Sequence, residues 1–376
     1  MDLALSSDQK SFRESVESFV ARHAPRDTLV ALNASGMSWK PEWYSHYGRA
    51  GWLGAAVPEA LGGAELDPLT LVLLCEELGK APVPSPFLAS SIVGALLLRA
   101  CVPVPGRDAV LSGIADGSCI VAPALRMPGR SWRGVCGSPI QLARGTGKTF
   151  VLDGTSLFVP YADAATHLLV NVRPPDEGKA AFALLAADSA GVTRRTLQGL
   201  INSAFEVTFE SVTLDGNAIF EVDPVIDVDD EIMLARLAIC GYQIGGSANL
   251  VDRSIEYSNE REQFGMPIGR FQRVQDHIIE ALNALDSARW ITYHAAWSAE
   301  RDRPDAAVRA YLAQAAASTS YLTAANSAHE VFAGIASDPA SGITLHTEMS
   351  RTLYDLLGSP DWAQRRASST LDWATA

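Results

Sequence analysis

The chain has 376 residues, of which 48% are hydrophobic and 19% are charged, and its formal net charge at pH 7 is −13. This length predicts two or three domains, and the composition is that of a globular protein rather than a disordered one. The acidic balance excludes a general affinity for nucleic acid, which needs clustered lysine and arginine to neutralise phosphates.

The N-terminal segment MDLALSSDQKSF lacks the basic and apolar regions of a signal peptide. No uncharged apolar run approaches the roughly 20 residues that cross a bilayer. We therefore expect a soluble, cytoplasmic protein without membrane contact. The five cysteines are widely spread and form no C-x-x-C pair, so the sequence predicts neither a disulfide framework nor a thiolate metal site.

The first 118 residues are predicted to be helical. An amphipathic pattern indicates a helix over 6–20, with a serine or aspartate available as N-cap. Residues 51–100 hold two more helical runs around a loop rich in glycine and proline, where Pro82, Pro84 and Pro86 end the first run.

Residues 119–226 are predicted to form an all-β domain. Short runs such as CIVAPAL, TFVLDG, SLFVP and EVTFESVTL are β-branched or alternating, and Gly, Pro or Asp separates them. The segment ARGTGKTF at 143–150 ends like a phosphate-binding loop. However, Leu142 stands where that motif requires glycine, and a strand-like run follows in place of a helix. We interpret this segment as a hairpin turn.

Residues 227–376 return to the helical period. One apolar stripe runs from Met233 to Ile255, a second runs from Val274 to Ile291, and an alanine-rich helix is predicted over 306–332. The predicted fold is therefore an N-terminal helical domain (1–118), a central β-barrel or β-sandwich domain (119–226) and a C-terminal four-helix bundle (227–376) that drives oligomerisation.

The stretch NEREQFGMPIGRFQRVQD at 259–276 looks like one long helix that glycine and proline interrupt. Turn chemistry alone explains these residues as a corner between two helices, with the arginine solvated. The alternative is a binding site, in which Arg261 neutralises a diphosphate, glutamines offer hydrogen bonds and aromatic side chains flank a flat ring.

The residues of this break resemble a known signature. The string R-x-Q-F-G-x-P-I-x-x-F-Q is similar to the FAD-binding signature of acyl-CoA dehydrogenases, and GWLGAAVPEALGG (51–63) and EELGKAPVPSPF (76–87) also resemble that family. The resemblance spans nearly the whole chain and agrees with the helical, β, helical order. It implies contacts to the ADP portion of FAD from six residues: Arg261, Gln263, Phe264, Ile268, Phe271 and Gln272.

The family resemblance also implies an activity. Such a flavoprotein removes an α-proton of an acyl thioester with a carboxylate base while the β-hydride passes to the flavin, and an electron-transfer flavoprotein then reoxidises the flavin. The two family positions of the base fall here near Gly358 and near Ala235, and neither is a carboxylate. Glu231, one turn before Ala235, and Glu348 are the candidate replacements.

Other family positions depart from the pattern as well. APALRMPGRSW (122–132) and SLFVPYADAATHLLV (156–170) replace the segments that hold the isoalloxazine ring, and EVFAG replaces Q-x-x-G-G, with Glu330 and Ala333 as the changed residues. The family's R-x-Q-F-G segment serves the FAD of a neighbouring subunit, whereas the changed segments serve the subunit's own flavin. This chain thus resembles the non-catalytic partner in heteromeric, steroid-degradation-type acyl-CoA dehydrogenases.

Three functions follow from these observations. The first is a subunit that contributes FAD-binding surface to an unlike catalytic chain, within a tetramer that desaturates an acyl thioester. The second is a self-sufficient homotetrameric dehydrogenase with Glu231 or Glu348 as base. The third is a flavin-free structural subunit. The sequence leaves open whether the acyl group is fatty, branched or a steroid side chain, and whether it is carried by CoA or by a carrier protein.

Overall fold

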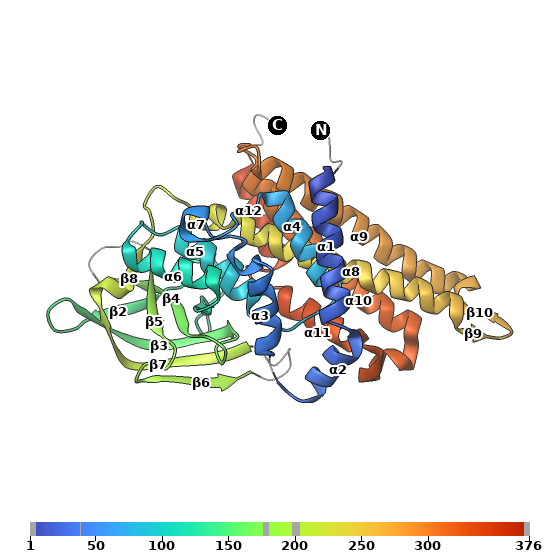
Figure 1. The fold of residues 1–376 in the computed structure, drawn as a ribbon, viewed down its shortest axis with the longest axis horizontal. Coiled ribbons are helices and arrows are strands. Elements are labelled where there is room, and N and C mark those ends of the chain that lie inside the picture. The colour runs from blue at the N-terminus through green and yellow to red at the C-terminus, as the bar shows by residue number, and fades with distance from the viewer. Residues whose placement is uncertain (1–4, 38, 176–179, 198–203, 372–376) are drawn as a thin grey trace. The chain divides into compact units, whose positions relative to one another are not determined.

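The computed structural model describes residues 5–37, 39–175, 180–197 and 204–371. The chain forms two compact units, each assembled from separate stretches of sequence. The first, which we call the bundle unit, comprises 1–37, 67–83 and 236–376, and the second, the sheet unit, comprises 38–66 and 84–235. Figure 1 labels the elements of both.

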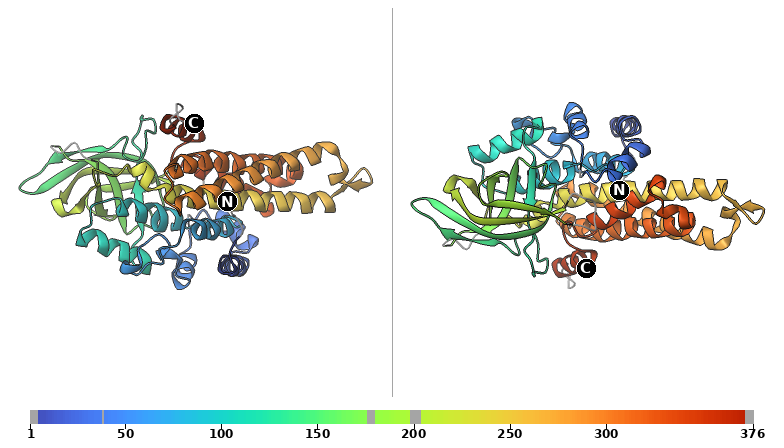
Figure 2. Two further views of the ribbon diagram at one scale, coloured as in Figure 1. Left: turned by 90° about the horizontal axis from the view of Figure 1, so that it is seen from above. Right: turned by 90° about the horizontal axis from the view of Figure 1, so that it is seen from below.

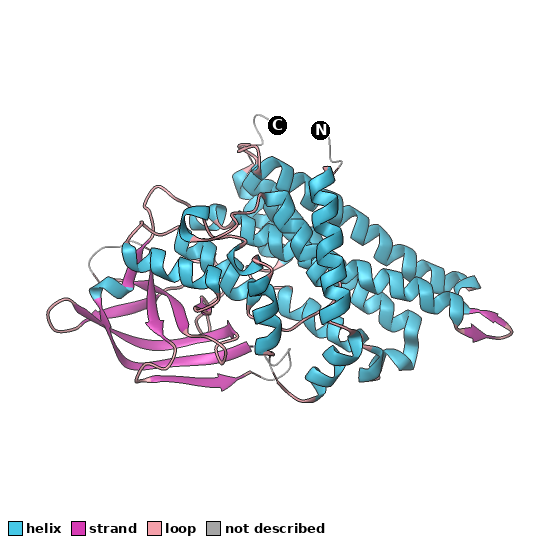
Figure 3. Ribbon diagram, viewed as in Figure 1, coloured by secondary structure: helices cyan, strands magenta, loops and turns pink. Residues whose placement is uncertain are grey.

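The sheet unit combines short helices with one large sheet. Its strands, magenta in Figure 3, are β1 (Val121–Ala124), β2 (Ile140–Arg144), β3 (Thr149–Pro160), β4 (His167–Arg173), β5 (Ala181–Ala186), β6 (Val192–Thr196), β7 (Ala204–Asp215) and β8 (Ile219–Glu221). Its helices are α3 (Pro41–Arg49), a π-helix (Leu88–Gly94) that continues as α5 (Ala95–Arg99), α6 (Pro105–Asp116) and α7 (Val228–Glu231).

The strands follow the order β6-β7-β3-β2-β4-β5-β8, and β1 pairs with β4. Among the described residues, β6 and β8 do not pair, so the sheet is open rather than closed into a barrel and corresponds to the sandwich alternative. The runs TFVLDG and SLFVP form one long strand, β3, in which irregular register near Gly154 and between Ser156 and Val159 bends the chain without ending its pairing with β7.

The segment ARGTGKTF joins β2 to β3, which confirms the predicted hairpin turn. The Gly145 amide donates to the Thr149 carbonyl over 2.9 Å, and Gly147 has a positive φ of 66°. Glycine adopts this backbone conformation without steric cost, so the turn chemistry fully explains the sequence.

The bundle unit contains the remaining long helices: α1 (Ser7–His23), α2 (Arg26–Ala34), α4 (Pro68–Gly79), α8 (Met233–Glu260), α9 (Gln272–Ala299), α10 (Ala306–Phe332), α11 (Ile343–Leu353) and α12 (Pro360–Thr370). Ser6 and Gln9 form a capping box at the start of α1. The limits predicted for the alanine-rich helix are those of α10, which packs extensively against α9.

Small residues bring α4 and α8 close together. A Cβ on Gly79 would lie 2.0 Å from the Tyr242 carbonyl oxygen, and one on Gly245 would lie 1.8 Å from the Glu76 carbonyl oxygen. Only glycine fits at either position, because any larger residue would force the two backbones apart. This close approach ties a segment of the N-terminal half of the chain into the C-terminal bundle.

Both predicted apolar stripes are buried along their middle. Leu237, Cys240 and Ile244 of the first stripe and Leu285 and Ala288 of the second are buried in the bundle.

Residues at the edge of the second stripe are exposed. Helical spacing puts the exposed Ile279, Leu282 and Trp290 on one side of α9, so α9 presents an exposed apolar face there.

Along the chain, a sheet-forming region lies between helical N-terminal and C-terminal regions, which agrees with the predicted fold class. The three ranges 1–118, 119–226 and 227–376 stay a prediction of domain limits, since compact packing groups the chain into two units. Within the described residues, no helix combines the length and apolar character that a membrane span requires.

Candidate functional site

The interrupted stretch at 259–276 forms a short β-hairpin between two long helices. After α8 ends at Glu260, β9 (Glu262–Gln263) pairs antiparallel with β10 (Met266–Pro267), and α9 begins at Gln272. Phe264 and Gly265 form the turn, with positive φ values of 54° and 79°. Two consecutive positive φ values are what a two-residue hairpin turn requires. In both views of Figure 2 the hairpin lies at the free end of the α8–α9 pair.

The base of the hairpin is held firmly on α8. The Ile268 amide donates to the Arg261 carbonyl over 2.8 Å, and the Arg261 amide donates to the Tyr257 carbonyl over 2.8 Å. A Cβ on Gly269 would lie 3.0 Å from Ser258 Oγ and 3.1 Å from its carbonyl oxygen, so glycine permits this close packing. The hairpin is therefore a fixed projection with well-defined hydrogen bonds at its base.

The side chains of the hairpin face outward. Arg261, Gln263 and Gln272 are exposed, and Phe264 retains 90% of its accessible surface. Phe264 and the partly buried Phe271 make an edge-to-face contact, with ring centroids 6.0 Å apart. Ile268 is also partly buried. Among the described residues, the Arg261 side chain has no hydrogen-bond or ion-pair partner.

The two candidate bases lie in different units. Glu231 is an exposed side chain at the end of the short helix α7, in the sheet unit. Glu348 is half-buried on α11 in the bundle unit, where burial raises the pKa of its carboxyl although a hydrogen bond from Asn33 opposes that shift. Among the described residues, neither carboxylate has a hydrogen bond or ion pair with the hairpin, so their roles stay predictions.

The loop that contains Gly358 is locked by a polar network that the sequence analysis missed. Arg236 is only 1% exposed, and its Nη1 donates to Gln314 Oε1 and to the Leu357 carbonyl, both over 2.7 Å. The Gln314 amide donates in turn to the Gly358 carbonyl over 2.6 Å. The Arg236 guanidinium also lies 4.9 Å from the Tyr311 ring centre. The sequence signal that could have revealed this network is the position of Arg236 among the apolar residues of a predicted long helix.

The segment 122–132 of the sheet unit also makes contacts within its own unit. Arg126 lies over the Trp132 ring at 4.6 Å, and its carbonyl accepts hydrogen bonds from the Leu157 amide and the Ser156 hydroxyl at 2.8 and 3.0 Å. Ser156 is buried. The loop after β1 thus closes against β3 through contacts within the unit.

Ala333 occupies an unfavourable backbone conformation. It follows α10 with φ 50° and ψ −134°, a region that glycine adopts far more readily than alanine. His329, one turn earlier, accepts or donates a hydrogen bond with Thr347 Oγ1 over 2.9 Å. The EVFAG segment thus turns the chain where the Q-x-x-G-G pattern has glycine.

Comparison with known proteins places this geometry in a family. The N-terminal domain model of acyl-CoA dehydrogenases matches residues 6–117, and the C-terminal domain model matches 228–359. The chain belongs to the acyl-CoA dehydrogenase family. The two models together cover both helical regions and the hairpin, which agrees with the resemblance noted from the hairpin sequence.

Relatives within the acyl-CoA dehydrogenase family match over almost the full length. The acyl-CoA dehydrogenase IpdE2 of Mycolicibacterium smegmatis is 24% identical over 364 residues, covering 96% of this chain and 98% of the relative. The ChsE4-ChsE5 complex from Mycobacterium tuberculosis contains a chain with the same fold, with a TM-score of 0.87 and 23% identity over 98% of both chains. The structure of a Tcur3481-Tcur3483 steroid acyl-CoA dehydrogenase variant matches with a TM-score of 0.85 and 25% identity, again over 98% of both chains.

Proposed function

We propose that this chain is a subunit of an FAD-dependent acyl-CoA dehydrogenase and contributes its hairpin to a flavin site shared with an unlike, base-bearing chain. The reaction is the α,β-desaturation of an acyl thioester. The observation that carries the proposal is the hairpin itself, a fixed projection whose arginine, glutamines and phenyl ring are exposed. Among the described residues, the Arg261 side chain has no hydrogen-bond or ion-pair partner.

The hairpin residues suit the ADP half of FAD. Arg261 supplies an uncompensated positive charge for the diphosphate, and Gln263 and Gln272 supply amides that both donate and accept. The exposed ring of Phe264, oriented by Phe271, suits a flat heterocycle. Bound FAD would supply the hydride acceptor, while these side chains hold its diphosphate end.

The remainder of the chain supports a partner role. The loop at Gly358 offers no carboxylate, and the Arg236–Gln314 network fills the space beneath it. Arg126 stacks on Trp132 within the segment that, by the family resemblance, replaces one that holds the flavin ring. A chain that binds FAD only through the hairpin needs another chain to provide the base.

The exposed apolar face of α9 suits association with such a chain. Ile279, Leu282 and Trp290 are all more than a third exposed in the single chain. Two of the similar solved structures are named after pairs of proteins, the ChsE4-ChsE5 complex and the Tcur3481-Tcur3483 steroid acyl-CoA dehydrogenase. We therefore propose a heterotetramer acting on a steroid-type acyl thioester, with an electron-transfer flavoprotein as oxidant and a cytoplasmic location.

The first test is the visible absorption spectrum of the chain purified alone and after co-expression with a glutamate-bearing family member. We expect a colourless protein alone and near-stoichiometric FAD in the complex. In the complex, Arg261→Met should lower FAD content at least tenfold, because it removes a charge-assisted contact to the diphosphate. Arg365→Met, at an exposed position on α12, is the matched control and should leave FAD content unchanged.

A second function, the self-sufficient homotetramer, is tested on the same preparations. Stoichiometric FAD and dehydrogenase turnover by the chain alone would contradict the partner role. Under that second function Glu231→Gln or Glu348→Gln abolishes turnover, whereas under the partner role both substitutions leave the turnover of the complex within twofold. A complex that never acquires FAD would instead support the flavin-free structural function.

A further inference from the structure

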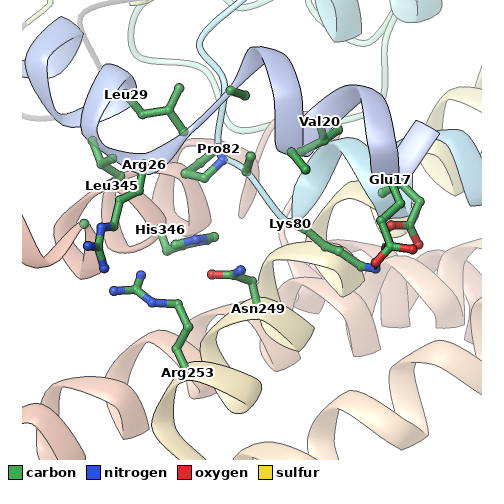
Figure 4. Close-up of a pocket in the computed structure, with 15 residues that line it drawn as sticks. Glu17, Val20, Arg26, Leu29, Lys80, Pro82, Asn249, Arg253, Leu345 and His346 are labelled. Carbon is green, nitrogen blue, oxygen red and sulfur yellow. Dashed lines mark ion pairs between the residues drawn. The ribbon is translucent and has the colours of Figure 1, made fainter. Parts of the chain in front are cut away.

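A cavity of about 250 Å³ lies within the bundle unit, away from the hairpin residues. Helices α1, α2, α4, α8 and α11 and the chain just after α4 line it, and Figure 4 shows the side chains that face it. This volume exceeds by far the ~15 Å³ that one water requires, yet it is at the small end of ligand pockets. A ligand of a few heavy atoms therefore fits.

At one end of the cavity, the charged side chains form ion pairs with one another. Lys80 Nζ lies 2.6 Å from Glu77 Oε2 and 3.7 Å from Glu17 Oε1, and Arg13 Nε lies 2.7 Å from the other Glu77 oxygen. The Glu77 side chain is fully buried. Both carboxylates that line the cavity are thus occupied by cations at this end.

The other end carries two arginines that these carboxylates do not reach. Arg253 comes from α8 and Arg26 from the start of α2, and Figure 4 shows both guanidinium groups at the same end of the cavity. Arg253 donates to the Ser341 carbonyl and lies 5.8 Å from the Phe332 ring centre. No carboxylate among the described residues forms an ion pair with it. A half-buried guanidinium without an anion is costly, because burial removes its hydration.

The electrostatics of this end confirm an excess of positive charge. Burial and the neighbouring Arg26 lower the pKa of Arg253, although Glu256 opposes that shift. Arg26 is 58% exposed, and it forms a 3.7 Å ion pair with the almost fully exposed Asp27. A Cβ on Gly342, the residue before α11, would lie 3.1 Å from Arg26 Cγ and 3.8 Å from Arg253 Nη1. The positive end of the α11 dipole therefore adds to the same field.

Two further polar groups line this end. The side-chain amide of Asn249, on α8, has no hydrogen-bond partner among the described residues. His346 is 2% exposed and shares a 2.8 Å hydrogen bond between Nδ1 and the buried Tyr321 hydroxyl. When that hydroxyl donates, the imidazole proton sits on Nε2 and becomes another donor. Val20, Leu29, Pro82 and Leu345 supply apolar walls.

We infer that this cavity binds a small organic carboxylate, with its carboxylate between Arg253 and Arg26 and its short apolar body against Val20, Leu29 and Leu345. The donors converge on one end, and the rest of that end's lining is apolar, so the site favours an anion with an aliphatic tail over a compact inorganic anion. This inference does not rest on the proposed flavin function, because the lining residues and the hairpin residues are separate.

Calorimetric titration of the full chain, or of its complex if it purifies only with a partner, tests the site. Sodium hexanoate should bind with one site per chain, and both hexanol and inorganic phosphate should bind at least tenfold more weakly. Arg253→Met keeps an unbranched side chain against Phe332 but removes the charge, and it should weaken hexanoate binding at least tenfold. The matched control Arg365→Met should leave hexanoate binding unchanged.

Three results would overturn the inference. These are the absence of saturable hexanoate binding, equal affinity for phosphate and hexanoate, or unchanged hexanoate affinity in Arg253→Met, which would place the ligand elsewhere. If circular dichroism shows that Arg253→Met does not fold, the substitution of the exposed Arg26, Arg26→Met, is tested in its place. A loss of hexanoate affinity of about threefold or more supports the site, and an unchanged hexanoate affinity contradicts it. Retention of FAD in these variants separates the carboxylate site from the flavin proposal.

Discussion

Two arginines at opposite ends of the helix α8 differ completely in their surroundings. Arg236, near its start, is buried and donates to Gln314 and to the Leu357 carbonyl within the chain. Arg261, just after its end, is exposed on the hairpin, and its guanidinium group has no hydrogen-bond or ion-pair partner among the described residues. The first is satisfied by its own chain and stabilises the fold. The second offers its charge outward, as expected of a residue that serves a ligand or another subunit.

The largest effect on stability is expected from Arg236→Met. This substitution leaves Gln314 Oε1 buried without its donor and removes the shorter of the two hydrogen bonds to the Leu357 carbonyl, which keeps a 3.2 Å bond from Gln314 Nε2. We therefore expect the free energy of unfolding to fall by about 3 kcal/mol. Urea denaturation followed by circular dichroism measures it. A loss below about 1 kcal/mol would show that the network is dispensable and would remove the contrast with the hairpin.

A second effect concerns pH and the buried pair of His346 and Tyr321. Burial, with Arg253 nearby, lowers the pKa of His346 to about 3. Because the folded pKa is below that of the unfolded chain, the unfolded chain binds more protons at acidic pH. The contribution of the neutral His346 to the free energy of unfolding is fully present above about pH 6.5, and it is lost as the pH falls towards 3.

The measurement for this pair is urea denaturation at several pH values. Between pH 6.5 and 4.5 we expect the wild-type chain to lose at least about 1.4 kcal/mol more than His346→Gln, since one pKa unit corresponds to that free energy. Parallel profiles for the two proteins would mean that His346 titrates normally in the folded state.

A smaller effect, of opposite sign, is expected at Ala333. Its φ of 50° and ψ of −134° cost alanine about 1–3 kcal/mol, whereas glycine adopts them freely but loses about 0.5–1 kcal/mol of entropy. Ala333→Gly should therefore stabilise the chain by about 1 kcal/mol. Ala316→Gly, in the interior of α10, is the matched control and should destabilise it by a similar amount. Equal effects of the two substitutions would contradict the assigned backbone strain.

The smallest stability effect is expected on the hairpin. Arg261→Met and Phe264→Ser remove exposed side chains and should change the free energy of unfolding by no more than about 0.5 kcal/mol. In the complex, however, both should lower FAD content, Arg261→Met the more strongly. The contrary outcome is that a hairpin variant unfolds the chain and its FAD content falls only in proportion to the folded fraction. Arg261 would then be a structural residue, like Arg236.

Local patterns in the sequence determined much of the architecture. Apolar periodicity predicted α1, α8, α9 and the limits of α10, because a helix is specified by residues three or four positions apart. Turn residues predicted the β2–β3 hairpin and the interruption after α8, because glycine and proline act on their own backbone. The hairpin signature also indicated the family, since all of its residues lie within one short stretch.

Tertiary structure alone decided which polar side chains are satisfied. Arg236 meets Gln314 and Leu357, and Arg253 meets Arg26 at one end of a cavity, only because helices distant in sequence pack together. Likewise, Leu282 and Leu285 both belong to the second apolar stripe, yet Leu285 is buried and Leu282 stays exposed. Burial depends on which elements pack against a residue, and a short-range sequence pattern does not specify those elements.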